Sequence, residues 1–389
     1  MSFDGTAIDQ LLKDAVGAGT YSGVSAIVVD RDGVLHHATA GSARPDTMFR
    51  NASMTKAPAT VGALQLVEQG RLDLDATVEA ILPEFGELQV LDGFDGDIPL
   101  LRAPKTKATV RQLATHTSGC GYFFTNQELS RYAELTGLPS VISGLKASLM
   151  SPLARDPGTQ WEYGISTDWL GLVVEAVAGQ TLDAYLAQSL YEPLGMSDTT
   201  FSPSAEQRSR LMDLEIRMPD GSLGPLGIDV PQEPEWASAG AGSYGTISDY
   251  GRFIRAMLRD GELDGVRVLE DATVRMAFTD QLNGVPLPEI MRSADPVLTN
   301  DVPTLPVPQG WGLGFHLMGI DIPGMRSAGT GDWAGLFNCF YWIDRNAGVG
   351  GAIMTQVLPF FDLPIIQGLL GFEAAVYAQV RDGAAALGS

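Results

Sequence analysis

Cysteine and histidine are scarce in this sequence of 389 residues, which contains two cysteines, Cys120 and Cys339, and four histidines. Two cysteines so far apart give no disulfide framework, so we expect free thiols and a cytoplasmic location. The histidines are dispersed, and neither they nor the cysteines have the spacing of metal ligands. We therefore expect no metal and no other cofactor.

Positive charge and long apolar runs are also in short supply. The chain carries 25 Lys and Arg against 47 Asp and Glu, a net charge of −22, and such a surface repels phosphate backbones and anionic lipids. The apolar runs, such as residues 349–354, are far too short to cross a bilayer. Residues 1–5 begin no signal peptide, because no basic segment precedes an apolar run there. We expect neither a nucleic-acid partner nor a membrane.

What the chain does have is apolar patterning, and 45% of its residues are hydrophobic, which suits a sizeable core. Alternating or continuous apolar residues predict strands at 25–29, 34–40, 335–343 and 349–356. Apolar residues at helical spacing predict helices at about 8–16, 53–69, 110–115, 168–178, 182–190 and 364–380. The turn at 30–33 makes the first two strands an antiparallel hairpin.

Strands near both ends with helices between them indicate an α/β (α+β) fold, with an antiparallel sheet flanked by helices and a helical insertion. We expect residues 1–75 and 236–389 to form one discontinuous mixed α/β domain. Residues 76–235 are expected to form a second, mainly helical domain. The acidic stretch at 92–97 lacks the calcium-loop pattern and is expected to be a surface loop.

Ser53 and Lys56 are the first candidates for chemistry. Residues three apart on a helix are neighbours, and a helix N-terminus offers free N–H groups to a developing anion. A serine needs an adjacent base to become a nucleophile, and a lysine can be that base only if its surroundings favour the free amine. Pro58 removes a helical hydrogen bond, so we expect a local distortion. The second Ser-x-x-Lys, Ser143 to Lys146, has the ordinary interpretation of a capping serine and a solvated lysine.

Two further elements acquire meaning only beside Ser53. Tyr163 follows the turn at 155–159, and its phenol is placed on a tight loop where it can exchange a proton with Lys56 and the nucleophile. The Gly-rich residues 327–338 lead into an apolar strand, whose edge can offer an N–H to an oxyanion. Each element alone is better explained by packing or by a turn.

Together the three elements resemble the three motifs of the penicillin-recognising serine enzymes. The resemblance is to class C β-lactamases, and most closely to the β-lactamase-like esterases called family VIII carboxylesterases. Residues 109–119 are similar to the family's LLxHTSG segment, residues 191–196 to its PLGM segment, and residues 341–344 to the strand after the third motif. The resemblance covers most of the chain and implies a β-lactamase/transpeptidase-like fold with the active site in the cleft between the two domains.

The resemblance implies roles for matching positions. Ser53 would be the nucleophile, Lys56 its base partner and Tyr163 the shared acid and base, while the backbone N–H groups of Ser53 and Leu336 would form the oxyanion hole. Which of Lys56 and Tyr163 is the base stays open, because coupled groups share their titration. Tyr122 is expected either to face the site or to pack in the core.

Two departures from the β-lactamase pattern point to esters. The second motif ends in Ser166, where β-lactamases usually carry Asn. The third motif reads Trp333-Ala334-Gly335 in place of Lys-Thr-Gly, so the cation that would bind a β-lactam or peptide carboxylate is missing. Trp333 is expected to line the acyl or the alcohol pocket, and Ser166 and Gly335 are further candidates for substrate binding.

The sequence thus predicts a serine carboxylesterase for short- to medium-chain esters, with a small-molecule ester as its partner. Acyl transfer to an alcohol, β-lactamase or D-amino-acid peptidase activity, and a non-catalytic binding module on the same fold are the alternatives. An α/β-hydrolase needs Gly-x-Ser-x-Gly, and residues 241–245 fail at the first position. His116 is the one histidine in a notable setting, and we expect it to make a structural hydrogen bond.

Overall fold

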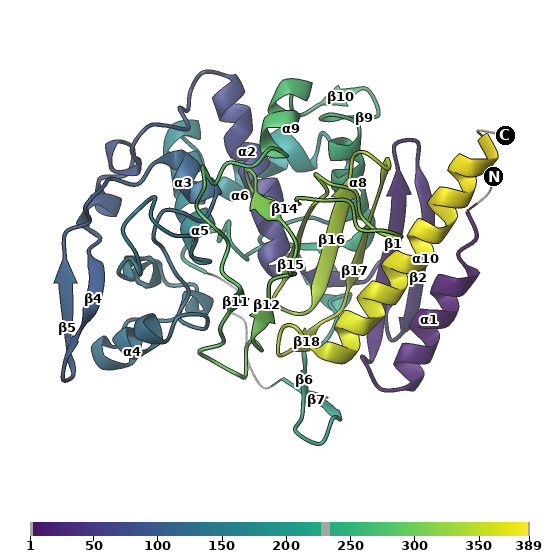
Figure 1. The fold of residues 1–389 in the computed structure, drawn as a ribbon, viewed down its shortest axis with the longest axis horizontal. Coiled ribbons are helices and arrows are strands. Elements are labelled where there is room, and N and C mark those ends of the chain that lie inside the picture. Colours follow the sequence, from purple (N-terminus) through teal and green to yellow (C-terminus); the bar gives the residue numbers. More distant parts are fainter. Residues whose placement is uncertain (1–2, 227–233, 388–389) are drawn as a thin grey trace.

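The computed structural model describes residues 3–226 and 234–387, with side chains to residue 380. A seven-stranded sheet lies at its centre (Figure 1). In spatial order the strands are β13 (Gln309–Trp311), β14 (His316–Met318), β15 (Gly331–Gly335), β16 (Cys339–Asp344), β17 (Val349–Met354), β1 (Gly23–Asp30) and β2 (Val34–Gly41). Every neighbouring pair is antiparallel, as predicted. The two ends of the chain therefore build one sheet.

The burial of each strand explains its sequence pattern. All residues of β16 and β17 are buried, and so are all but the last of β1, because helices or loops cover both faces of these strands. The edge strand β2 is more exposed along its length. Gly350 and Gly351 on β17 permit close packing, since a Cβ at either would lie 2.5 Å from a side-chain atom of Ile254 or Trp342.

Helices cover the two faces of the sheet. Helices α1 (Thr6–Gly17) and α10 (Leu363–Leu387) lie against one face and contact each other, and α8 (Ile247–Leu258) lies against the other (Figure 1). Ile8 and Leu12 of α1 and Phe372 of α10 are buried there in one apolar cluster. Beyond α8, the central helix α2 (Lys56–Glu68) is buried along most of its length.

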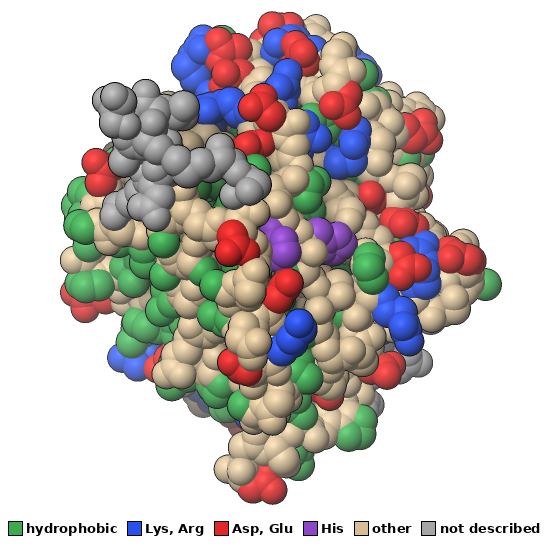
Figure 2. Space-filling view, turned by 90° about the vertical axis from the view of Figure 1, so that its right-hand side faces the viewer, with side chains coloured by type: hydrophobic (Ala, Val, Ile, Leu, Met, Phe, Trp, Pro, Cys, Tyr) green, Lys and Arg blue, Asp and Glu red, His purple; other side chains and the backbone are tan. Residues whose placement is uncertain are grey.

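Helix α10 is more apolar than we expected of any segment of this chain. Residues 363–380 are long and apolar enough, by length and composition alone, to cross a bilayer, so the expectation that no segment meets these two criteria is wrong. Buried core helices pass the same test, and Ile365, Phe372 and Val376 pack into the core. Leu363 and Leu370 of this helix are exposed. Figure 2 shows hydrophobic side chains among charged ones on the side of the molecule that lies at the right of Figure 1.

The region between α2 and α8 consists of helices joined by long loops and short strand pairs. Its α-helices are α3 (Val110–Ala114), α4 (Gln127–Thr136), α5 (Ser166–Ala178), α6 (Leu182–Leu186) and α7 (Ala205–Ser209), and a π-helical turn spans Ala187–Tyr191. Helix α9 (Asp271–Ala277) follows α8. The division into domains 1–75 with 236–389 and 76–235 stays a prediction.

Short strand pairs were missed in the sequence. Residues 92–97, expected to be a loop, belong to the hairpin of β4 (Val90–Asp95) and β5 (Ile98–Arg102), whose turn uses Gly96 at a φ of +59°. Arg102 donates to Asp92 across this hairpin, at 2.9 Å. The other short strands are β3 (Met48–Arg50), β6 (Glu215–Arg217), β7 (Leu223–Pro225), β8 (Tyr244–Thr246), β9 (Glu262–Leu263), β10 (Val266–Arg267), β11 (Ile290–Met291), β12 (Val302–Pro303) and β18 (Val357–Leu358).

The predicted strand 335–343 is wrong in its extent. The chain turns back after Gly335, and β15 and β16 form an antiparallel hairpin in which Trp333 pairs with Tyr341. Asn338 takes a left-handed φ of +56° in the turn, a conformation that asparagine tolerates better than most residues. Its side-chain nitrogen donates to the carbonyls of Val357 and Pro359, which fixes the turn against the next segment.

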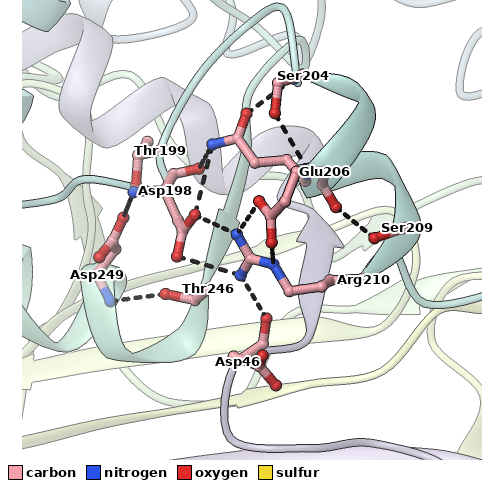
Figure 3. Close-up of polar contacts among 10 residues, drawn as sticks. Asp46, Asp198, Thr199, Ser204, Glu206, Ser209, Arg210, Thr246 and Asp249 are labelled. Atoms are coloured by element: carbon pink, nitrogen blue, oxygen red, sulfur yellow. Dashed lines mark hydrogen bonds and ion pairs between the residues drawn. The ribbon is translucent and has the colours of Figure 1, made fainter.

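A polar cluster ties the segment before α8 to the rest of the fold (Figure 3). Arg210 donates to the carboxylates of Asp198 and Glu206 and to the carbonyl of Asp46. Asp249, in the first turn of α8, accepts from the backbone N–H of Asp198 at 2.8 Å. Asp249 also accepts from the Thr199 hydroxyl, at 2.9 Å.

Asp249 is expected to make stability depend on pH. Burial raises the pKa of this carboxyl from 3.8 to about 6, so the folded state favours the protonated form. Its contribution to stability is full below pH 3.8 and is lost as the pH rises through about 6. An Asp249→Asn variant keeps the acceptor oxygen, so above pH 6 its free energy of unfolding should exceed that of the wild type by at most about 3 kcal/mol. Urea unfolding at pH 4 and pH 8 measures this difference. An equal difference in the free energy of unfolding between the variant and the wild type at both pH values would contradict the prediction.

Candidate active site

The segment that carries Ser53 is a tight turn. It follows strand β3 and forms a 3₁₀ turn, Ala52–Thr55, before α2 begins at Lys56. The expected helix from Ser53 therefore starts three residues later than predicted. Ala52 has a φ of +44°, an unfavourable conformation for a residue with a side chain, and such strain is common at functional sites.

Pro58 accounts for part of this local geometry. A residue at this position would normally donate its N–H to the carbonyl of Met54, four residues earlier, and proline has none. The Tyr250 hydroxyl from α8 donates to the Met54 carbonyl instead, at 3.0 Å. The expected distortion is thus the 3₁₀ turn, and it is stabilised by a contact with α8.

Lys56 lies at the centre of the site and is only 2% exposed. Its ammonium nitrogen lies 3.0 Å from Ser53 Oγ, 3.1 Å from the Tyr122 hydroxyl and 2.7 Å from the carbonyl oxygen of Gly240. All three partners are neutral groups. No carboxylate forms a salt bridge with Lys56 among the residues that the structure describes.

Tyr163 lies beside the same amine but presents its ring to it. The Lys56 nitrogen is 4.8 Å from the centre of the Tyr163 ring. The Tyr163 hydroxyl accepts a hydrogen bond from the Trp333 indole N–H, at 3.0 Å. Because Trp333 occupies one lone pair of this oxygen, the phenolic hydrogen is free for another partner.

Tyr122 is placed in the site and not merely in the core. Its hydroxyl is bonded to Lys56, and its ring packs edge-on against Tyr163 with centres 5.2 Å apart. Burial, with Asp168 and Tyr163 nearby, raises the pKa of Tyr122 well above its ordinary value. Tyr122 therefore stays a neutral phenol.

His116 packs between aromatic rings. Its ring contacts Trp161, Tyr163 and Trp311, and its Nδ1 is buried without a hydrogen-bond partner in the described part of the chain. The expected structural hydrogen bond of this side chain is absent at that nitrogen. Burial and the charge of Lys56 lower the pKa of His116 well below its ordinary value, so the ring stays neutral.

The end of strand β15 closes on the Ser53 turn. A Cβ at Gly335 would lie 2.4 Å from the carbonyl oxygen of Asn51, so only glycine permits this approach. Leu336, the next residue, lines the same cavities as Ser53. The structure thus brings together the two residues whose N–H groups were predicted to form the oxyanion hole.

Ser166 lies apart from the site. It is completely buried at the start of α5, and its hydroxyl is bonded to that of Ser118 at 2.8 Å. Neither of the two cavities beside Ser53 includes it. The geometry does not support the expected contact between Ser166 and substrate.

Two cavities meet at Ser53, with Phe124 and Leu336 lining both. The larger, of about 240 Å³, lies beside Tyr163 and Trp333. The smaller, of about 150 Å³, lies beside Tyr122 and Trp236. The smaller cavity was not predicted, because much of its wall comes from residues 141–144 and 234–244, segments that carry no motif.

No group of three or more metal-ligating side chains occurs in the described segments. Cys120 and Cys339 are free and buried, and burial raises the pKa of each thiol to about 12. Neither sulfur is therefore available as a thiolate at neutral pH.

Comparison with known proteins places this geometry in a family. The beta-lactamase family model matches residues 8–367. The chain is 31% identical over 350 residues to the acyltransferase calJ of Penicillium decumbens, covering 87% of this chain and 82% of that protein. It is 32% identical over 380 residues to the lovastatin esterase of Penicillium rubens, covering 90% and 93%.

Solved structures agree on the fold. The unliganded simvastatin synthase LovD of Aspergillus terreus has a TM-score of 0.81 at 28% identity, over 96% of this chain and 97% of that one. EstCE1, a hydrolase with promiscuous acyltransferase activity, has a TM-score of 0.75 at 20% identity, over 96% and 98%. The fold is β-lactamase/transpeptidase-like, and the chain belongs to the beta-lactamase family, alongside acyltransferases and esterases.

Proposed function

We propose that this chain is a serine carboxylesterase that forms an acyl-enzyme on Ser53. One observation carries the proposal: a buried lysine, bonded only to neutral groups, lies 3.0 Å from Ser53 Oγ where two largely apolar cavities meet. A base within hydrogen-bond reach of a serine hydroxyl is the arrangement that makes the oxygen a nucleophile.

The first half of the reaction begins at Ser53. The free amine of Lys56 takes the hydroxyl proton as Ser53 Oγ bonds to the ester carbonyl carbon. The carbonyl oxygen becomes an oxyanion, which the N–H groups of Ser53 and Leu336 stabilise. The tetrahedral intermediate then expels the alkoxide.

Tyr163 is the group that protonates the leaving alkoxide. Trp333 donates to the phenolic oxygen, so the hydroxyl hydrogen is free. Of the two cavities, Tyr163 lines only the larger. The resulting phenolate is stabilised by the Trp333 N–H and by the adjacent Lys56 ammonium. The leaving alcohol therefore occupies the larger cavity and the acyl group the smaller one.

The second half restores the starting state. Water enters from the larger cavity, gives a proton to the Tyr163 phenolate and attacks the acyl carbon. As the acid departs, Ser53 Oγ takes its proton back from Lys56. No group is left changed, so the cycle requires no cofactor.

The substrate we propose is an uncharged ester with a short- to medium-chain acyl group. Trp333 stands where a cation would bind a substrate carboxylate, and the walls beside it are aromatic. The 150 Å³ cavity limits the length of the acyl chain. These features oppose β-lactams and peptides as preferred substrates.

Widening one cavity at a time should alter one half of the substrate. In Trp236→Ala the smaller cavity grows, so the optimum among p-nitrophenyl esters should move to longer acyl chains, with kcat/KM for the octanoate rising about tenfold relative to the acetate. Leu287 lines only the larger cavity, and Leu287→Ala should change the preference among butyrate esters of different alcohols instead. If Trp236→Ala changed the preference for the alcohol and Leu287→Ala the preference for the acyl chain, the assignment of the two cavities would be reversed.

Acyl transfer to an alcohol is a second candidate. Similar proteins include the acyltransferase calJ and a monacolin J acid methylbutanoyltransferase of Aspergillus terreus, 34% identical over 354 residues. A 240 Å³ cavity beside Tyr163 has room for an alcohol in place of water. Adding a competing alcohol separates the two, because a transferase yields mainly the new ester and a hydrolase mainly the free acid.

Hydrolysis of p-nitrophenyl acetate, butyrate and octanoate beside a chromogenic cephalosporin tests the proposal. We expect turnover of the esters, little cleavage of the cephalosporin, and loss of both in Ser53→Ala. Faster cleavage of the cephalosporin would favour β-lactamase activity. No turnover of any ester would favour a binding module.

A further inference from the structure

The proposed mechanism leaves a charge that needs a partner. When Lys56 takes the Ser53 proton it becomes a buried ammonium, yet its three hydrogen-bond partners are neutral. His116 and Tyr122 are held neutral beside it. The oxyanion and the Tyr163 phenolate balance this charge only transiently, and burying a charge without a lasting counter-charge is costly, so a carboxylate within electrostatic reach would stabilise the ammonium.

Asp168 of α5 is a buried carboxyl that the mechanism does not use. Its Oδ1 accepts from the Ser238 hydroxyl at 2.6 Å and from the backbone N–H of Gly240 at 2.8 Å. Its Oδ2 is buried and has no hydrogen-bond partner among the described residues. The carbonyl of the same Gly240 accepts from Lys56. One glycine peptide segment thus connects the carboxyl group to the amine.

The fit between Asp168 and Gly240 leaves no room for a side chain. A Cβ at Gly240 would lie 2.5 Å from Asp168 Oδ2 and 2.8 Å from its Cγ. The same loop is fixed at its other end, where the Ser243 hydroxyl is bonded to that of Thr55 at 2.7 Å, inside the Ser53 turn. The Gly240 carbonyl is therefore held in place from both sides.

Among the described residues, Lys56 is the cation whose charge acts on the Asp168 carboxyl. Burial raises the pKa of Asp168 above its ordinary value, and the charge of Lys56 and the bonds from Ser238 and Gly240 oppose this rise. The other titratable groups it influences, Tyr122 and Cys120, are both held neutral by burial.

We propose that Asp168 is a positioning residue for the base: it provides the counter-charge for the Lys56 ammonium and fixes the Gly240 carbonyl that receives one of its N–H groups. Asp168 transfers no proton itself, because Lys56 keeps the proton until Ser53 takes it back. The inference rests on the proposed function of Ser53 and Lys56.

Asp168→Asn tests the charge, because asparagine keeps an acceptor oxygen for Ser238 and Gly240. Without the carboxylate Lys56 is a weaker base, so kcat for p-nitrophenyl butyrate should fall about tenfold with little change in KM. The acid limb of the kcat profile should move about one pH unit lower, because the ammonium has lost its counter-charge. A merely structural role would lower activity without moving this limb, and an unmoved limb would overturn the proposal.

Two further variants keep the test conclusive. Ser238→Ala changes a partly exposed side chain and should fold even if Asp168→Asn does not. It removes a hydrogen bond that favours the ionised form of Asp168, so it should move the acid limb in the same direction by a smaller amount. Asp249→Asn, a buried acid outside both cavities, should leave kcat and the limb unchanged. If Ser53→Ala retained activity, the proposed function would fail. If Ser53→Ala is inactive and the acid limbs of the kcat profiles of Asp168→Asn and Ser238→Ala both stay at the wild-type pH, only the role of Asp168 fails.

Discussion

Replacing Lys56 by alanine should lower kcat for ester hydrolysis about 10³-fold, with a much smaller change in KM. The amine lies 3.0 Å from Ser53 Oγ, and no other basic side chain among the described residues is bonded to that oxygen. Without the amine, the Ser53 proton has no acceptor in the first step. Steady-state kinetics with p-nitrophenyl butyrate measure the loss.

Lys146 provides a matched control for this prediction. It belongs to the second Ser-x-x-Lys of the chain, but Ser143 Oγ accepts from the backbone N–H of Leu145, at 3.3 Å, and Lys146 is exposed. Lys146→Ala should therefore keep wild-type kinetics. Near-normal turnover in Lys56→Ala, with folding intact by circular dichroism, would show that Lys56 is not the base.

Replacing Tyr163 by phenylalanine should lower kcat about 10²-fold, because the leaving alkoxide loses its proton donor. The loss in kcat/KM, which reports acylation, should be largest for esters of alcohols with a high pKa and small for p-nitrophenyl esters, whose leaving group needs little protonation. The loss in kcat should extend to both kinds of ester, because the same Tyr163 oxygen takes the proton of water in deacylation. This dependence on the leaving group distinguishes loss of a proton donor from loss of packing. Kinetics with ethyl and p-nitrophenyl butyrate measure it.

Tyr122→Phe is the matched control for Tyr163→Phe. Tyr122 is a neutral phenol that accepts from Lys56 and lines only the smaller cavity. Its removal should slow both esters to a similar extent. If the loss of activity depended on the leaving group in Tyr122→Phe and not in Tyr163→Phe, the acid would be Tyr122.

Local spacing explains what the sequence revealed about the site. Ser53 and Lys56 are three residues apart, so their contact follows from a helical turn and was predictable. Tyr122 contacts the same amine from 66 residues away, and Gly240 from 184 residues away. Such contacts depend on how the segments pack, which is why Tyr122 stayed ambiguous and Gly240 and Asp168 were missed.

Much of the fold was also predictable from local patterns in the sequence, and the errors in its prediction are local too. Hairpins and buried strands have a strong pattern, so β1, β2 and β17 were placed within two residues of their bounds. The turn between β15 and β16 was missed because Leu336 and Phe337 continue the apolar run through it. Asn338 favours a turn, but the apolar residues on both sides of it indicate a continuous strand.

The covalent intermediate tests the central claim most directly. Wild-type enzyme and Ser53→Ala are mixed with p-nitrophenyl butyrate, quenched in acid during turnover, and analysed by intact mass and peptide mapping. We predict a butyryl group on Ser53 in the wild type and no adduct in Ser53→Ala. A butyryl group on another residue, or on the Ser53→Ala protein, would contradict the account.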